Sequence, residues 1–119
     1  MGVRDFRELI AWQLSYELKC EVLAFTATGP ASKDFKYRDQ IEDSSASAPR
    51  NIAEGFGRFR PADFARFLEI ARASLKETQN HLVDGRDRRY LQNALYSRLQ
   101  NLARAALKST TNLMLSKQR

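Results

Sequence analysis

The stretch PRNIAEGFGRFRPADF, residues 49–64, concentrates prolines and glycines in a chain that elsewhere shows the period of an α-helix. Its two glycines invite comparison with a phosphate-binding loop. A dinucleotide-binding fingerprint requires a third glycine where the chain has Arg60, and it requires a preceding β-strand, which the pattern does not contain. A Walker motif requires Gly-Lys-Ser or Gly-Lys-Thr, which the sequence lacks. We therefore interpret the stretch as a corner between two helices.

Residues on both sides of the corner support this interpretation. Gly57 suits the position just after a helix, because glycine adopts the left-handed backbone conformation without a steric clash. Pro61 suits the first position of the next helix, and Asp63 is favourable in its first turn. The sequence thus predicts one helix that ends near Phe56 and another that begins near Pro61.

The helix before the corner is predicted to start near Tyr37 and to be kinked. Its central residues 44–48 are all small, which allows a neighbouring backbone to approach closely. Pro49 cannot donate a hydrogen bond to the carbonyl group of Ser45, so the helix should bend there. We expect a hydroxyl group of Ser44 or Ser45 to compensate for part of the lost bond.

Three other segments show apolar residues at steps of three and four. Asp5 is the expected N-cap of the first, which ends at residues 28–30. The third helix runs from the corner to Gly85, and the fourth starts at Leu91. Four helices with short connections predict an all-α fold, an antiparallel up-down-up-down four-helix bundle that forms a single domain over residues 1–119. The first helix has two adjacent apolar stripes: Leu9, Trp12, Tyr16, Cys20 and Leu23, and then Ile10, Leu14, Leu18, Val22 and Phe25.

The composition is that of an ordinary globular domain, with 43% hydrophobic and 29% charged residues. No segment approaches the ~20 apolar residues of a membrane-spanning helix, so we expect no membrane insertion. The only cysteine, Cys20, excludes an internal disulfide, and its place in an apolar stripe predicts a buried, unreactive thiol. We expect a cytoplasmic protein without a cofactor.

The net charge of +6 is unevenly distributed along the chain. Residues 1–43 contain 6 Lys and Arg against 8 Asp and Glu, whereas residues 44–119 contain 14 against 6. Most of these cations are arginines, whose guanidinium groups make bidentate contacts with phosphates. The asymmetry favours a polyanionic partner, although a solvated basic surface explains the charge equally well.

Arginines near two predicted corners are the candidate contacts to RNA or DNA. Arg58 and Arg60 flank Phe59, and two cations around an aromatic ring suit both phosphates and stacked bases. The densest cationic loop, residues 86–89, follows the third helix. Solvated arginines, with Phe59 packed against a neighbouring subunit, explain the same pattern. The candidate nucleic-acid-binding residues are Arg58, Arg60, Arg86, Arg88, Arg89, Arg98 and Arg104.

The sequence gives little support for catalysis. His81 is the only histidine, and we interpret it as a surface or capping residue because no cluster of His or Cys accompanies it. Glu42 and Asp43 are adjacent and therefore face different sides of a helix, unlike an acid–base pair. Glu54 lacks a catalytic partner and lies four residues before Arg58, which predicts an ion pair. We expect a protein that is not an enzyme.

The string QIEDSSASAPRNIAEGFGR, followed by FARFLEIARASLKET, resembles the four-helix-bundle family named after the 23S rRNA intervening sequence, also called the S23 family. The likeness extends to FRELIAWQLSYEL and covers roughly residues 6–92, whereas the fourth helix matches only in character. The motif residues that we interpret as structural are Asn51, Glu54, Gly55, Gly57 and Arg58.

The resemblance implies a small antiparallel bundle that assembles into a ring, typically a homopentamer, and it implies no catalysis. Family members are encoded in insertions within ribosomal RNA genes or elsewhere in bacterial chromosomes. A related bundle binds nucleic acid as an accessory protein of a reverse transcriptase. The family commonly has a basic pair where this chain has Glu42 and Asp43, which counts against RNA binding by that face. It also tends to have Ser or Thr where this chain has Arg60, and loss of such a helix cap costs about 1 kcal/mol.

Two functional hypotheses follow. The first is a non-enzymatic, ring-forming bundle that binds nucleic acid through arginines, in which case binding should weaken steeply with added salt. The second is a structural or protein-interaction module that self-associates and has no nucleic-acid role. Wide apolar faces and exposed aromatic residues favour the second hypothesis. These aromatic residues are Trp12, Phe56, Phe59 and Tyr96.

Overall fold

The structure, a computed structural model, describes residues 2–118. Within these residues it contains four long α-helices, two short 3₁₀ helices and no β-strand, which confirms the all-α prediction. In chain order the elements are η1 (Phe6–Glu8), α1 (Ile10–Thr26), η2 (Pro30–Lys33), α2 (Phe35–Phe56), α3 (Pro61–Asp87) and α4 (Asn93–Lys117).

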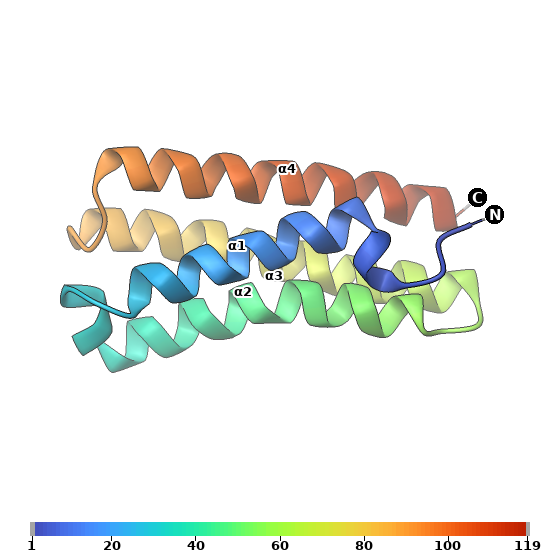
Figure 1. Ribbon diagram of the computed structural model, residues 1–119, viewed down its shortest axis with the longest axis horizontal. Coiled ribbons are helices and arrows are strands. Elements are labelled where there is room, and N and C mark those ends of the chain that lie inside the picture. The colour runs from blue at the N-terminus through green and yellow to red at the C-terminus, as the bar shows by residue number, and fades with distance from the viewer. Residues whose placement is uncertain (1, 119) are drawn as a thin grey trace.

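The long helices form the predicted antiparallel up-down-up-down bundle, with extents of 45 × 22 × 20 Å (Figure 1). α1 packs on α2, α2 on α3, α3 on α4, and α4 packs back on α1. The α2–α3 corner lies at the same end of the bundle as both ends of the described chain, and we call this the terminal end. The α1–α2 and α3–α4 connections lie at the opposite end, which we call the loop end.

The core consists of aliphatic residues that the helical period places on the inner faces. Leu18, Leu75 and Leu99 are fully buried in a cluster that reaches the loop end, and Ile52 and Leu68 are fully buried in a second cluster at the terminal end. Burying one such side chain stabilises a protein by about 1.5–3 kcal/mol, so these positions hold the four helices together.

Only one side of the wide apolar face of α1 packs inside the bundle. Leu18 and Val22 are buried, whereas Tyr16, Cys20 and Leu23 are exposed. The prediction of a buried thiol at Cys20 is therefore wrong. The position lies on the outer side of α1, where apolar spacing does not lead to burial within one chain.

Asp5 is an N-cap, as predicted, but it caps η1 and not the first long helix. The carboxylate of Asp5 accepts a hydrogen bond from the backbone N–H of Arg7 at 2.8 Å. The guanidinium group of Arg7 also donates to this carboxylate, at 2.7 Å. The side-chain bond and then the backbone bond lower the pKa of Asp5 to about 2. Leu9, in an extended conformation, separates η1 from α1.

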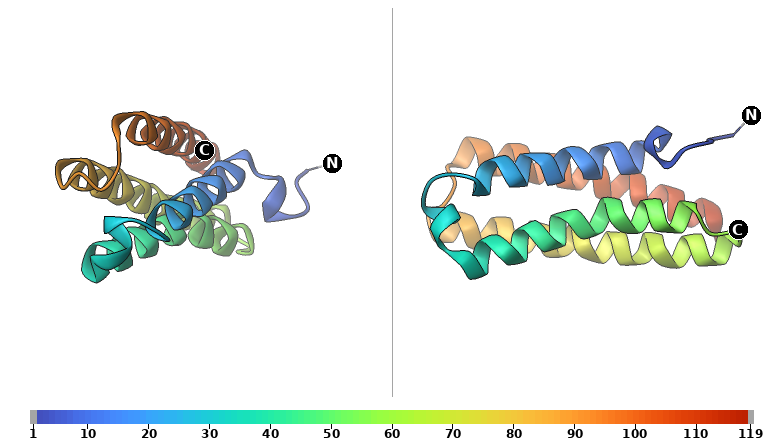
Figure 2. Two further views of the ribbon diagram at one scale, coloured as in Figure 1. Left: turned by 60° about the vertical axis from the view of Figure 1, so that its left-hand side comes forward. Right: turned by 60° about the horizontal axis from the view of Figure 1, so that its bottom comes forward.

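α2 remains a single helix through Pro49, and its axis changes direction along its length (Figure 2). The predicted compensation by serine hydroxyl groups is wrong. Ser44 Oγ donates to the carbonyl group of Ile41 at 3.2 Å, and Ser45 Oγ donates to the carbonyl group of Glu42 at 3.2 Å. Both hydroxyl groups bond one turn back along the helix, as serine commonly does.

A line of hydroxyl groups joins α2 to α3. Ser44 Oγ lies 2.8 Å from Thr78 Oγ1, and Ser47 Oγ lies 2.7 Å from Ser74 Oγ. These short side chains let the two helices approach closely, as the run of small residues predicts. We call the four residues the hydroxyl seam.

Gly55, and not Gly57, is the glycine that the α2–α3 corner requires. A Cβ atom at Gly55 would lie 2.7 Å from the Cβ of Phe67 and 2.8 Å from Cδ1 of Phe64, so the helices leave no room for a side chain. Gly57 has a right-handed φ of −76°, and a Cβ there would make only ordinary contacts. The predicted left-handed conformation of Gly57 is therefore wrong, whereas Pro61 begins α3 as predicted.

The left-handed residue at the end of α3 is Arg89, with a φ of 65°. Its N–H donates to the carbonyl group of Arg86 at 2.9 Å, and the N–H of Tyr90 donates to that of Gly85 at 2.8 Å, which is a Schellman motif. Gly85 does not end α3, contrary to the prediction, because it lies inside the helix. A Cβ at this position would collide with the hydroxyl group of Tyr37, so this glycine also permits close packing.

Candidate nucleic-acid interface

The terminal end carries two of the candidate arginines. Arg58 donates to the carboxylate of Glu54 at 3.0 Å, which confirms the predicted pair, and its guanidinium group packs 4.8 Å from the centre of the Phe67 ring. Arg60 makes no cap hydrogen bond, and the ion pairs among residues 2–118 do not include it. Phe59, between the two arginines, is 100% exposed.

Residues 86–89 lie at the loop end, on the far side of the bundle from this corner. The guanidinium group of Arg86 packs 4.3 Å from the centre of the Tyr96 ring. Arg88 forms an ion pair with Asp84 at 3.0 Å and lies 3.7 Å from a second carboxylate, in the connection before α2. The charge of Arg88 is thus largely balanced within the chain.

Two candidate arginines lie on α4. Arg98 forms an ion pair with Glu21 of α1 at 2.6 Å, and Arg104 donates to the side-chain amide oxygen of Asn101. The seven arginines therefore divide between the two ends of the bundle and the side of α4. They do not form one continuous patch.

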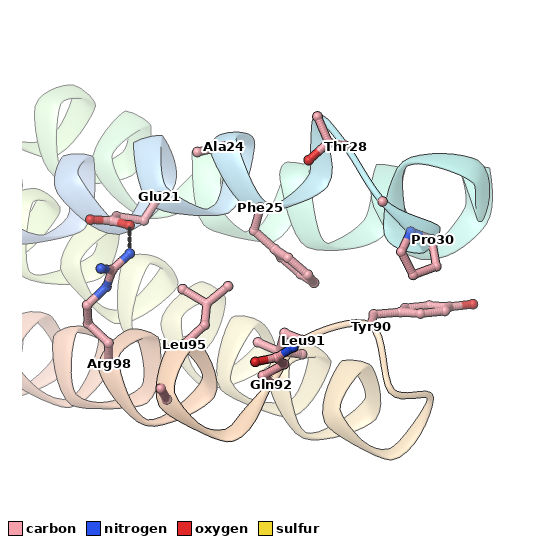
Figure 3. Close-up of a pocket in the computed structure, with 12 residues that line it drawn as sticks. Glu21, Ala24, Phe25, Thr28, Pro30, Tyr90, Leu91, Gln92, Leu95 and Arg98 are labelled. Carbon is pink, nitrogen blue, oxygen red and sulfur yellow. Dashed lines mark hydrogen bonds and ion pairs between the residues drawn. The ribbon is translucent and has the colours of Figure 1, made fainter.

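A groove of about 730 Å³ separates the end of α1 from the start of α4 (Figure 3). Phe25 and Leu95 line it from opposite sides, and the Glu21–Arg98 ion pair lies at one end. Tyr90 lies at the other end, in the α3–α4 connection. Arg98 reaches across to α1 through its ion pair with Glu21, and its side chain remains 64% exposed.

A polar cluster at the loop end was not predicted. Asp34 caps α2 by accepting the backbone N–H of Tyr37 at 3.2 Å, and it also accepts the hydroxyl group of Tyr90 at 2.5 Å. The bond from Tyr90 is the main cause of the lowered pKa of Asp34. Tyr37 donates to the carbonyl group of His81 at 2.7 Å, and burial raises the pKa of Tyr37 well above its usual range. The sequence feature that could have indicated this cluster is Asp34, an aspartate just before a helix with an apolar face.

His81 is neither a surface residue nor a cap, contrary to the prediction. Its side chain is only 14% exposed, and the Nε2 atom has no hydrogen-bond partner within the described chain. The carboxylate of Glu77 lies 3.6 Å from this atom. Packing between α3 and its neighbours covers the imidazole, which a single polar position in a helical pattern does not indicate.

Residues 2–118 contain neither a cluster of metal ligands nor a membrane-spanning helix. No three His, Cys, Asp or Glu side chains gather there in a way that could hold a metal ion. None of the helices in this part of the chain has the length and apolar character needed to cross a membrane.

The family comparison covers most of the chain. The model described as 23S rRNA-intervening sequence protein matches residues 7–112. This chain belongs to the 23S rRNA-intervening sequence protein family. The sequence alone showed a clear likeness only over residues 6–92. The family match extends further, into α4.

A solved structure has a similar fold. It is a crystal structure of a protein of unknown function from the S23 ribosomal protein family of Bacteroides thetaiotaomicron. The two proteins are 23% identical, with a TM-score of 0.80 over 88% of this chain and 98% of the other. The comparison with curated proteins gave no match.

The motif residues of this 23S rRNA-intervening sequence protein make contacts within α2 and at its contact with α3. Asn51 donates to the carbonyl oxygen of Ser47 at 2.8 Å, at the edge of the hydroxyl seam. Gly55 permits the close approach of α2 and α3, and the Glu54–Arg58 pair spans the last turn of α2. These contacts fit the structural interpretation of the motif.

The chain departs from the family pattern at Glu42 and Asp43 in α2, and at Arg60 before α3. Glu42 accepts a hydrogen bond from the hydroxyl group of Thr26 in α1 at 2.6 Å, whereas Asp43 is exposed. The adjacent carboxylates thus face different sides, as predicted. Arg60 has no side-chain cap bond at the start of α3, which fits the absence of Ser or Thr there.

The aromatic residues expected at the surface differ in exposure. Phe59 is exposed, whereas Trp12, Phe56 and Tyr96 are half-buried. Trp12 stacks on Tyr16 with ring centroids 4.7 Å apart. Phe59 is therefore the one of these four aromatic side chains that presents its whole surface to solvent.

Proposed function

We propose that this member of the 23S rRNA-intervening sequence protein family is a non-enzymatic, cytoplasmic bundle that binds RNA or DNA through arginines. The observation that carries the proposal is the charge of residues 44–119, with 14 basic against 6 acidic residues. Such an excess of arginine suits contacts with phosphates, which fix a nucleic acid on a protein without a need for catalysis.

The arginines differ in how available they are for phosphates. Arg60 and Arg89 lie at exposed corners, and the ion pairs among the described residues include neither of them. Arg58, Arg88 and Arg98 are each held by a carboxylate of the same chain. We therefore assign the strongest contacts to Arg60 and Arg89.

We further propose that the protein assembles into a ring, a homopentamer, in keeping with its family resemblance. Exposed apolar residues on the outer side of the bundle support self-association, among them Ile10, Tyr16 and Leu23 of α1. A ring would repeat each arginine corner around its axis. Several weak contacts on one nucleic acid would then add to a higher overall affinity.

The same exposed residues favour the alternative, a structural or protein-interaction module without a nucleic-acid role. Internal ion pairs of three candidate arginines also support it, because a paired guanidinium group is less available for phosphates. The two functions share self-association and differ in salt-sensitive binding to nucleic acid.

The test combines the mass of the assembly in solution with binding to labelled RNA and DNA at two salt concentrations. We expect a ring-sized oligomer, and binding that weakens with salt in proportion to the number of phosphate contacts. The variant R60A/R89A should bind more weakly than K19A/K33A, which removes the same charge from the acidic half of the chain. Absence of binding at low salt, or equal binding by the two variants, would contradict the proposal.

A further inference from the structure

The most unusual side chain on the surface is Phe59, in the connection between α2 and α3. It is 100% exposed, although an aromatic ring is normally covered by its own chain. Gly57 on one side is also exposed, and Pro61 on the other begins α3, so the connection is short and held by a helix on each side. The ring is thus presented to solvent on a short connection between two helices.

The surroundings of this ring are basic. Arg60 follows it directly, and the adjacent Arg58 already neutralises Glu54. A surface hollow next to Pro61 is lined by residues from the start of α3 and the end of α4, including Arg66 and Lys117. The hollow also contains one carboxylate, Glu69. Asp63 also lies in the first turn of α3. The corner therefore carries a small excess of cations, which are Arg58, Arg60, Arg66 and Lys117 against Glu54, Asp63 and Glu69.

We infer that this corner binds single-stranded nucleic acid, with Phe59 as a platform on which a base stacks. Arg60, Arg66 and Lys117 contact the phosphates on either side of that base. This inference rests on the proposed function and specifies the ligand and the site. An aromatic platform requires the open face of a base, which a single strand offers and the interior of a duplex does not.

A second exposed aromatic residue provides a contrast. Phe35 is 65% exposed at the loop end, at the start of α2. The guanidinium group of Arg38 already covers its ring, 4.9 Å from the ring centre. Lys33, Lys36 and Arg38 lie within a few residues of it, together with the carboxylates of Asp34 and Asp39. Phe35 therefore differs from Phe59 because a cation of its own chain already occupies one face of its ring.

The experiment measures binding of a labelled single-stranded oligonucleotide and of the matching duplex by fluorescence anisotropy. We expect F59A to weaken single-strand binding by about 10-fold, the effect of losing one stacked base, and to leave duplex binding unchanged. The variant F59W should retain the affinity, and its fluorescence should be quenched by the single strand more than that of the wild type. F35A is the matched control and should bind as the wild type does.

The outcomes separate the inference from the proposed function. If neither strand form binds the wild type, the proposed function and the inference both fail. If both forms bind and F59A has no effect, the inference fails while the proposed function stands. If F59A instead lowers the mass of the assembly in solution, a second copy of the chain covers Phe59 and the inference is overturned. Circular dichroism checks that each variant remains folded.

Discussion

Replacing Gly55 with alanine tests the close approach of α2 and α3 at the corner. The new Cβ would lie 2.7 Å from the Cβ of Phe67, an atom fixed to the backbone of α3 that cannot rotate away. It would also lie 2.8 Å from Cδ1 of Phe64. The two helices would have to separate, and overpacking of this kind costs about 1–3 kcal/mol.

Alanine also has a favourable effect at this position, because it is a better helix former than glycine by about 1 kcal/mol. Since both close neighbours belong to the adjoining helix, we take the upper part of the overpacking range. The expected net loss for G55A is then about 1–2 kcal/mol in the free energy of unfolding. For a chain of this size, that lowers the melting temperature by about 4–8 °C.

The assay is thermal or urea unfolding followed by far-UV circular dichroism, at equal protomer concentrations because self-association raises apparent stability. The matched control is G57A, where a Cβ meets the carbonyl oxygen of Glu54 at 3.5 Å, an ordinary contact. That variant should be as stable as the wild type, or more stable by up to about 1 kcal/mol. A G55A protein as stable as G57A would refute the close approach.

Three further predictions concern the loop end and the hydroxyl seam. The bond from Tyr90 lowers the pKa of Asp34, so this carboxylate stabilises the fold above its unfolded pKa of about 4, and the contribution is lost as the pH falls through the lower folded value. Thermal melts between about pH 5 and pH 2.5 should therefore show a smaller decrease for D34N than for the wild type, and parallel curves would contradict this assignment. The variant T78V should lower the free energy of unfolding by about 1–2 kcal/mol, because it leaves the hydroxyl group of Ser44 with a poorer partner. In a double-mutant cycle, S44A/T78V should lower this free energy by less than the sum of the two single variants. Additive effects would show that the two hydroxyl groups are not coupled. R89G should raise the stability by about 1 kcal/mol in urea unfolding, because glycine adopts the left-handed conformation at this position without strain, and a destabilised variant would show that the side chain contributes more than its backbone costs.

The helices and the corner could be predicted because their signals are local. Apolar spacing identified the long helices, and Pro61 fixed the start of α3 as predicted. The roles of Gly55 and Gly85 could not be predicted, because each depends on a side chain that another helix places against it. Glycine in a sequence indicates a turn or a close contact equally well, and only the packing of neighbours distinguishes the two.

Burial on α1 was the least predictable part of the fold. An apolar stripe through Tyr16 and Cys20 has the same period as the buried stripe through Leu18, yet it faces outward. The period of a helix specifies which residues share a face. It does not specify whether that face meets the same chain or solvent.

The candidate site was predicted in part. The sequence identified the basic residues, and it identified the Glu54–Arg58 pair because the two residues are four positions apart. It could not reveal that Arg98 is held by Glu21, since 77 positions separate them and only the packing of α4 on α1 brings them together. The availability of a surface arginine is thus a property of tertiary contacts.

The hydroxyl seam has a consequence for the mechanical behaviour of the molecule. Sliding α3 along α2 by one turn would break both hydroxyl–hydroxyl hydrogen bonds, at about 0.5–1.5 kcal/mol each, although Ser44, Ser74 and Thr78 also bond carbonyl groups of their own helix. The two pairs of hydroxyl groups therefore favour one register of α2 against α3. A ligand that contacts the terminal end and the loop end at once must be long enough to span the full length of these helices.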